Sequence, residues 1–453
     1  MPKRGQFFSA VLALLTMAAC APELKTGPFR QARHYTASES LQAILTFEHQ
    51  VVFTSPRSPT IEKAEEAIEN QVSHLFGPMS AAEYPAVPKA DHRLTKIEIS
   101  PKPGSSRTYI ASYRYRGTIV VSKGAGEDYE LILPVNPETI YKASIPKSGN
   151  RESPCTDSHY NSEEDFWYFW NPRNPGCPLK EGVDYLVVTG TLEKIENMKS
   201  SYPEYERLVD ESGTLLMTVL VGMDESTNGR DPMQSSDLNA RSFRTIRSKL
   251  IKTGFKGRRW ERPDYRAKIS GFPSRLRQLP YVEEFSKTGK NARVVVRMVF
   301  GPSGIDEPST AFHYLFKDAL ENASAVIYNG HSGLGGHLDL LAIEESETFE
   351  INIPRDRYQI YFFDSCSSYT YYNSLYFERK KSATDPDGTR NLDILTNGLA
   401  SDFESGAKNN FALIQALTDW ATGKSETSYQ QLATTIAGDE FFGVNGDEDN
   451  PAR

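Results

Sequence analysis

The sequence has no apolar run long enough to span a bilayer, no excess of basic residues and few cysteines. The apolar stretch Phe7–Leu15 is shorter than the roughly 20 residues that a transmembrane helix needs. Lys and Arg number 51 against 59 Asp and Glu, and this net charge of −8 argues against nucleic-acid binding, which requires a basic surface. The 453 residues, 38% of them hydrophobic, suffice for two or three folded domains.

The first 20 residues have the pattern of a secretory signal peptide. A positive pair, Lys3 and Arg4, precedes the short apolar stretch, and small residues follow it. The run Leu15–Cys20, which reads Leu-Thr-Met-Ala-Ala-Cys, resembles the lipobox of bacterial lipoproteins. That resemblance implies that Cys20 is acylated and anchors the chain to a membrane, and Ala21 after it favours the outer membrane. The alternative is a cleaved signal without a lipid.

Export to an oxidising compartment gives the remaining cysteines different expected roles. Cys155 and Cys177 flank one loop and are expected to form a disulfide, which would contribute roughly 3 kcal/mol. Cys366 is then an unpaired thiol, either reactive or buried and inert.

The N-terminal half predicts a small domain attached to the anchor by a polar tether, residues 21–40. Residues 41–53 and 61–76 show helical spacing of apolar positions, and alternation follows. We therefore expect an N-terminal α+β domain over residues 41–150 and a disulfide-stapled loop over 151–180. Five consecutive aromatic residues, Phe166–Trp170, are either a ligand platform or the packing core of that loop. The alternating segments are Leu94–Ile99, Tyr109–Val121 and Tyr129–Val135.

Residues 181–445 alternate between buried-strand and amphipathic-helix patterns, which predicts an α/β domain with a mostly parallel sheet between two layers of helices. The expected strands are Leu215–Val221, Val294–Phe300, Ala325–Tyr328, Tyr358–Phe363 and Leu392–Thr396, and the expected helices are Ala240–Thr253, Ala311–Ala323 and Phe411–Ala421. Residues 446–453 are predicted to form an acidic tail, which is either solvated or binds calcium.

Two strand ends of this domain carry reactive side chains. One strand runs into Gly330-His331-Ser332-Gly333, and another into Asp364-Ser365-Cys366. The carboxyl ends of parallel strands are where such sheets bind ligands, so we expect His331 and Cys366 to lie at one edge. A thiolate is a nucleophile and an imidazole takes and returns its proton, which is the chemistry of a cysteine peptidase.

A strand followed by Gly-His-x-Gly, and about 35 residues later a strand followed by Asp-Ser-Cys, resembles the caspase-like cysteine peptidases of clan CD, which include gingipains, legumain and CHAT domains. The resemblance covers about residues 210–440. It implies a Cys366 nucleophile and a His331 general base, and it requires no metal or cofactor. The turn Gly330, Ser332 and Gly333 would supply an oxyanion donor, although the family has Gly directly after the His. Asp364 is either a specificity residue for basic side chains or structural.

Other catalytic arrangements fit the sequence less well. A serine-hydrolase elbow needs Gly two places after the Ser, where this chain has Leu334. A papain-like order needs a His after the Cys, and no His follows Cys366. His331, His337 and Asp339 have no regular metal-ligand spacing. The sequence thus predicts a lipid-anchored endopeptidase of the cell envelope that acts on protein or peptide substrates. An inactive caspase-like scaffold that binds a partner is the alternative.

Overall fold

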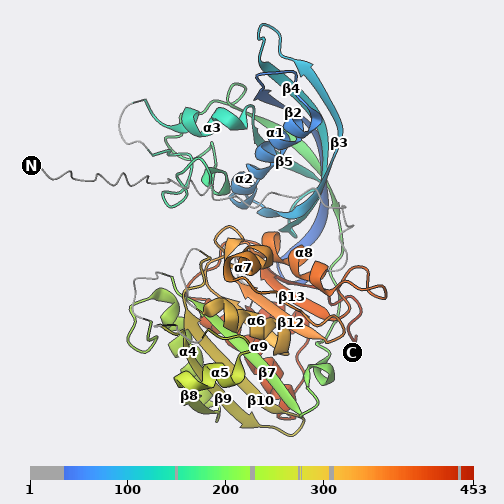
Figure 1. The fold of residues 1–453 in the computed structure, drawn as a ribbon. Coiled ribbons are helices and arrows are strands. Elements are labelled where there is room, and N and C mark those ends of the chain that lie inside the picture. Colours follow the sequence, from blue (N-terminus) through green and yellow to red (C-terminus); the bar gives the residue numbers. More distant parts are fainter. Residues whose placement is uncertain are drawn as a thin grey trace, which may run out of the picture.

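The computed structural model describes residues 35–147, 152–224, 230–273, 276, 278–305, 311–436 and 440–452. The predicted signal peptide, Cys20 and most of the expected tether lie outside these residues. The chain is α/β, with two sheets that each carry helices, and the two units lie one above the other in Figure 1. No helix in the described residues combines the length and apolar character that crossing a bilayer requires.

The N-terminal unit is a five-stranded sheet in the order β3-β4-β2-β6-β5, and all its neighbours are antiparallel. Three helices accompany it, and all three contact its strands. Its strands are β2 (Ser40–Thr54), β3 (Ala86–Pro101), β4 (Thr108–Ser122), β5 (Asp128–Pro134) and β6 (Tyr185–Lys194), and its helices are α1 (Ile61–Ser73), α2 (Phe76–Ser80) and α3 (Pro137–Ser144).

The helix predicted over residues 41–53 is wrong, because this segment is strand β2. Ala43, Leu45, Phe47, Val51 and Phe53 all point into the core of the N-terminal unit, which is the period of two that a strand requires. Apolar residues on the other face of β2 obscure that period in the sequence. The helix expected from residue 61 is confirmed as α1.

The predicted boundary at residue 181 lies one strand too early. Strand β6 pairs with β2 and β5 and so belongs to the N-terminal sheet, not to the α/β domain. Local sequence pattern identifies a strand but does not show which sheet it joins, because pairing depends on distant segments.

Cys155 and Cys177 form a disulfide, as the sequence predicts. The loop that this disulfide closes is held by its own aromatic residues. Phe166 and Trp170 are buried with Cys155 against Ile132 of β5. The interpretation of the aromatic run as a packing core is therefore confirmed for these two residues.

The α/β domain has a nine-stranded sheet in the order β1-β14-β13-β12-β11-β7-β10-β9-β8. The five strands from β13 to β10 are mutually parallel, and the outer strands pair antiparallel. The strands are β1 (Thr36–Ala37), β7 (Thr214–Gly222), β8 (Lys256–Arg259), β9 (Tyr281–Thr288), β10 (Arg293–Gly301), β11 (Ala325–Asn329), β12 (Gln359–Asp364), β13 (Leu392–Asn397) and β14 (Phe442–Asn445).

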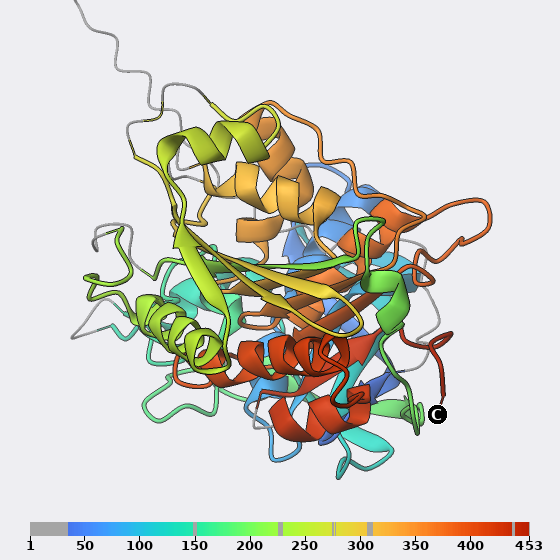
Figure 2. The same ribbon diagram turned by 90° about the horizontal axis from the view of Figure 1, so that it is seen from below.

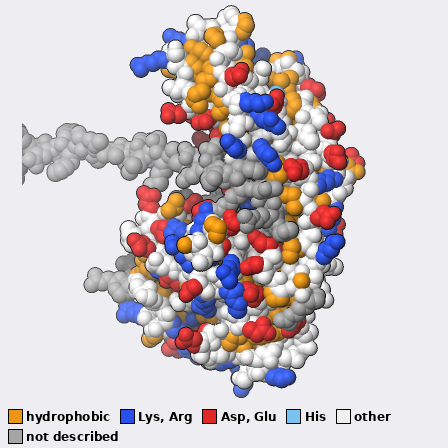
Figure 3. All heavy atoms as spheres, turned by 90° about the vertical axis from the view of Figure 1, so that its right-hand side faces the viewer, with side chains coloured by type: hydrophobic (Ala, Val, Ile, Leu, Met, Phe, Trp, Pro, Cys, Tyr) orange, Lys and Arg blue, Asp and Glu red, His pale blue; other side chains and the backbone are white. Residues whose placement is uncertain are grey.

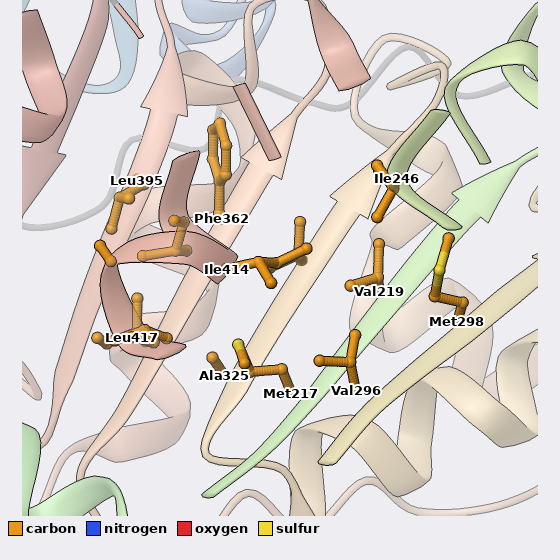
Figure 4. Close-up of a cluster of buried hydrophobic side chains, with 14 of the residues drawn as sticks. Met217, Val219, Ile246, Val296, Met298, Ala325, Phe362, Leu395, Ile414 and Leu417 are labelled. Atoms are coloured by element: carbon orange, nitrogen blue, oxygen red, sulfur yellow. The ribbon is translucent and has the colours of Figure 1, made fainter. Parts of the chain in front are cut away.

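Helices cover both faces of this sheet (Figure 2). The side chains beneath α4, α9 and α10 form one apolar cluster, in which Met217 and Val219 of β7 meet Ile414 and Leu417 of α9 (Figure 4). A second cluster lies on the opposite face beneath α5, α6, α7 and α8. The helices are α4 (Leu238–Lys252), α5 (Arg262–Lys268), α6 (Phe312–Asn322), α7 (Leu340–Glu347), α8 (Ser368–Lys380), α9 (Gly406–Ala421) and α10 (Tyr429–Ile436).

The predicted solvated acidic tail is wrong for Asp447, its first acidic residue. Asp447 is fully buried, and its carboxylate accepts hydrogen bonds from the hydroxyls of Thr36 and Ser201. Burial raises the pKa of Asp447 to about 6. The segment after β14 therefore ties the start of the described chain to the α/β domain.

The two units meet at helix α8, which begins two residues after Cys366. The hydroxyl of Thr370 donates to the Pro88 carbonyl at 2.8 Å, and Gln42 Nε2 donates to the Tyr369 hydroxyl at 2.9 Å. The N-terminal unit thus lies beside the strand end that carries the candidate nucleophile (Figure 1). On the face in Figure 3, acidic and basic side chains are interspersed, and hydrophobic side chains gather near its upper end.

Candidate active site

Three neighbouring parallel strands, β7, β11 and β12, end at the same edge of the sheet. Asn329 at the end of β11 is in register with Val221 of β7 and with Asp364 of β12. Each strand is followed within two residues by a chemically reactive side chain: Asp224, His331 and Cys366. Adjacent strands lie roughly 4.8 Å apart, so this register brings the three residues to one rim.

The imidazole of His331 is held by Asp224, a partner that the sequence reasoning missed. Nε2 of His331 lies 2.7 Å from Oδ1 of Asp224. The side chains of His331 and Asp224 are 39% and 19% exposed, so the pair is partly accessible to solvent. An Nε2–H that donates to the carboxylate leaves Nδ1 as the proton acceptor. The sequence signal for this partner is limited to an acidic residue two positions after β7.

Asp224 is held in place by a hydrogen bond from its own backbone N–H group. Its N–H donates to the carboxylate of Asp237 at 2.9 Å, and Asp237 also caps the N-terminus of α4 through the backbone N–H groups of Asn239 and Ala240. The loop between β7 and α4 is thereby pinned at both ends.

The thiol of Cys366 is partly accessible and contacts the loop that follows β13. Its sulfur lies 3.6 Å from the Ser401 hydroxyl and 4.0 Å from the Ser401 carbonyl. The side chain has intermediate exposure and forms no disulfide. None of the described residues accepts a hydrogen bond from the backbone N–H of Cys366, so this donor is available to a developing oxyanion.

The same loop also contacts the histidine. The ring of Phe403 packs edge-on against the ring of His331, with 5.6 Å between centroids. Ser401 at the sulfur and Phe403 at the imidazole are two residues apart, which limits the separation of the thiol and the imidazole. Within the described structure the His331 ring and the Cys366 sulfur share no hydrogen bond.

His331 lies in the glycine-rich turn after β11, and two tyrosine hydroxyls hold the backbone of this turn by hydrogen bonds. The Tyr328 hydroxyl donates to the His331 carbonyl at 2.7 Å, and the Tyr372 hydroxyl donates to the Ser332 carbonyl at 3.2 Å. Gly333 has φ +55°, and a Cβ there would lie 2.2 Å from the His337 ring, so this position requires glycine. Gly330, which precedes the histidine, lies close to the Tyr328 hydroxyl.

His337 and Asp339, which a metal site with His331 would require, each have another hydrogen-bond partner. Nδ1 of His337 lies 3.2 Å from the Ser303 hydroxyl, and burial lowers the pKa of His337 to about 4. The carboxylate of Asp339 caps α7 by accepting from the Ala342 N–H. The described residues contain no group of three or more His, Cys, Asp or Glu side chains arranged to hold a metal ion.

Asp364, two residues before Cys366, is fully buried. Its carboxylate accepts hydrogen bonds from the side-chain amides of Asn397 at 2.8 Å and Asn410 at 2.6 Å. Burial, and after it the charge of the nearby Glu440, raise the pKa of Asp364 to about 8. This environment agrees with the structural interpretation of Asp364 and leaves it no contact with a substrate side chain.

The stapled loop reaches the cysteine turn. The Tyr168 hydroxyl lies 2.8 Å from the hydroxyl of Ser367, the residue after Cys366, and both groups are buried. A cavity of about 450 Å³ lies beside this contact, between the stapled loop, α2 and the turns after β12 and β13.

Comparisons with known proteins identify no family for this chain. No family model matches it, and neither does any curated protein. Among solved structures, the G domain of the T. maritima FeoB iron transporter aligns with 46% of this chain and 99% of its own length, at 12% identity and a TM-score of 0.19. A similarity this low carries no argument about fold or function.

Proposed function

We propose that this protein is a caspase-like cysteine endopeptidase in which Cys366 is the nucleophile, His331 the general base and Asp224 the residue that positions His331. The observation that carries the proposal is the placement of these three side chains at the ends of adjacent parallel strands, with Asp224 bonded to His331. The motif resemblance at Gly330–Gly333 and Asp364–Cys366 supports the same assignment.

The reaction follows from the acid–base properties of these groups. Nδ1 of His331 takes the thiol proton, and the sulfur attacks the peptide carbonyl carbon to form a C–S bond. The Cys366 N–H stabilises the oxyanion, and His331 gives its proton to the departing amine as the C–N bond breaks. Water then attacks the thioester, its proton passing to His331 and on to the Cys366 sulfur, which releases the carboxylic acid product.

Covalent labelling tests the nucleophile directly. The folded protein is treated with a peptidyl electrophile and mapped by mass spectrometry, and we expect modification at Cys366 that is lost in Cys366→Ala and slowed in His331→Ala. Peptide-library cleavage by the same three proteins gives the activity. If Cys366 reacts no faster than a free thiol and nothing is cleaved, the partner-binding scaffold takes the place of the peptidase.

We further propose that Cys20 anchors the enzyme to the outer membrane, on the support of the signal-like segment and lipobox resemblance. One acyl chain binds membranes weakly and reversibly, so stable attachment requires more than one. We expect the intact mature protein to carry the mass of acyl chains and to sediment with membranes. Cys20→Ser is expected to release it, and a soluble wild-type protein would contradict the anchor.

A further inference from the structure

The cavity beside Cys366 is built by both units of the protein. Phe76 from α2 and Asp157, Tyr168 and Phe169 from the stapled loop form one part of its lining, and Ser367 and Leu399 form the other. Its volume of about 450 Å³ is within the range of ligand pockets, roughly 300–1,000 Å³. The N-terminal unit therefore contributes walls to a cavity at the catalytic edge of the α/β domain.

Two independent contacts place this cavity next to the nucleophile. Ser367 is bonded to Tyr168 across the two units, and Ser401, which touches the sulfur, follows the lining residue Ala400. Electrostatics agree with this placement. Burial and then the charge of Cys366 raise the pKa of Tyr160 to about 12, and the same two causes raise the pKa of Tyr168.

The lining includes three aromatic rings, of which Phe169 is partly exposed. The rings of Phe76 and Tyr168 are buried and stacked, with centroids 4.7 Å apart, and Phe169 packs edge-on against Tyr168 at 4.6 Å. Aromatic faces attract cations, and they also pack against the methylene stems of lysine and arginine.

Among the described lining residues, Asp157 alone carries a charge. Its carboxylate accepts from the His159 backbone N–H at 2.9 Å and contacts the His159 ring at 2.7 Å. The backbone bond, and after it the ring, hold the pKa of Asp157 below its usual range, so the carboxylate is ionised at neutral pH. The Asp157 side chain is 49% exposed, which leaves its oxygens open to a further partner.

The loop around Asp157 also carries a net negative charge. Between Cys155 and Cys177 it holds four acidic residues, Asp157, Glu163, Glu164 and Asp165, against one basic residue, Arg173. A local excess of negative charge attracts cationic substrates and repels acidic ones.

We propose that this cavity is a substrate subsite that takes a lysine or arginine side chain close to the scissile bond. The methylene stem lies against the partly exposed ring of Phe169, and the cation faces Asp157. This inference rests on the proposed peptidase function, and it makes the N-terminal unit a part of the substrate-binding cleft.

Cleavage assays measure the preference. Fluorogenic peptides that differ only in lysine against norleucine, or arginine against citrulline, are compared with wild type and Asp157→Asn. We expect wild type to prefer the cationic peptides, and we expect Asp157→Asn to lose about tenfold in kcat/KM on those peptides alone, mainly through KM. Asp157→Lys is expected to reverse the preference, whereas Asp128→Asn, an exposed matched control on β5, leaves it unchanged.

A binding assay keeps the subsite testable without catalysis. The full chain carrying Cys366→Ala is titrated with a fluorescent lysine-containing peptide and its norleucine analogue, with and without Asp157→Asn. If the lysine peptide binds more tightly than its analogue and this difference depends on Asp157, the subsite is supported, whether or not the wild type cleaves peptides. If the wild type then cleaves nothing, only the peptidase assignment fails. Equal affinities for both peptides, or an unchanged ratio in Asp157→Asn, overturn the subsite even if cleavage at Cys366 is established.

Discussion

Nε2 of His331 lies 2.7 Å from the carboxylate of Asp224, although 107 positions separate them in the chain. The contact exists because β7 and β11 are parallel neighbours that end at the same edge of the sheet. It converts a histidine on a loop into one with a fixed orientation and tautomer. A group held in this way acts as a base at one defined nitrogen.

Replacing Asp224 by Asn is expected to reduce turnover without unfolding the protein. The amide keeps the shape of the carboxylate but does not favour the Nε2–H tautomer or stabilise the imidazolium. We expect kcat on a peptide substrate to fall by about 10²- to 10⁴-fold with little change in KM. Asp224→Glu is expected to recover part of the loss. A purely structural role for Asp224 predicts instead that melting temperature and kcat fall together and that Glu gives no recovery.

The disulfide is expected to stabilise the N-terminal unit and the cavity wall together. Cys155 and Cys177 are separated by 22 positions, and closing such a loop contributes about 3 kcal/mol to the free energy of unfolding. The double variant Cys155→Ala/Cys177→Ala is expected to lower the urea midpoint of the N-terminal unit accordingly. Labelling of Cys366 in the folded double variant should continue, because Cys366 follows β12, a strand of the other sheet. Loss of labelling in a variant that is still folded would contradict this division of roles.

Much of the α/β domain could be predicted from sequence, because its strands are buried on both faces and read as short apolar runs. The ends of β11 and β12 carry the Gly-His and Asp-Ser-Cys motifs, which identify His331 and Cys366 as candidates and predict that they lie at one edge of the sheet. Asp224 was not predicted, since an acidic residue after a strand is common and only the strand order reveals its partner. β2 has a helical pattern in sequence because apolar residues on its second face obscure the alternation. The domain boundary at residue 181 is wrong because sequence does not show that β6 pairs with the N-terminal sheet.

The bond between Tyr168 and Ser367 is expected to couple the stapled loop energetically to the cysteine turn. Both hydroxyls are buried and 2.8 Å apart, so Tyr168→Phe leaves the Ser367 hydroxyl without this partner. A double-mutant cycle with Tyr168→Phe and Ser367→Ala is expected to give a coupling energy of about 1 kcal/mol in the free energy of unfolding. Ser367 has φ +50°, and alanine keeps that backbone cost the same, so the cycle reports the hydrogen bond. Additive effects of the two substitutions would show that the hydroxyls do not interact.

Asp364 is expected to make stability depend on pH in one defined window. Its pKa is about 8 in the folded protein against an ordinary 3.8, chiefly because the carboxyl is buried. Between these two values the folded state holds a proton that the unfolded chain releases. The contribution of Asp364 to the free energy of unfolding therefore falls as pH rises from about 4 to about 8, and it is constant above that.

Asp364→Asn removes this titration, and its neighbours can accommodate the change. Oδ1 atoms of Asn329, Asn397 and Asn410 are buried without a donor in the described structure, so they offer acceptors to the new amide. We expect the stability of Asp364→Asn relative to wild type to increase between about pH 5 and about pH 8, measured by urea denaturation. Asp128→Asn is the exposed control, whose curve should run parallel to wild type. If the Asp364→Asn curve also runs parallel, the carboxyl is ionised in the folded protein, and its bonds to Asn397 and Asn410 outweigh the cost of its burial.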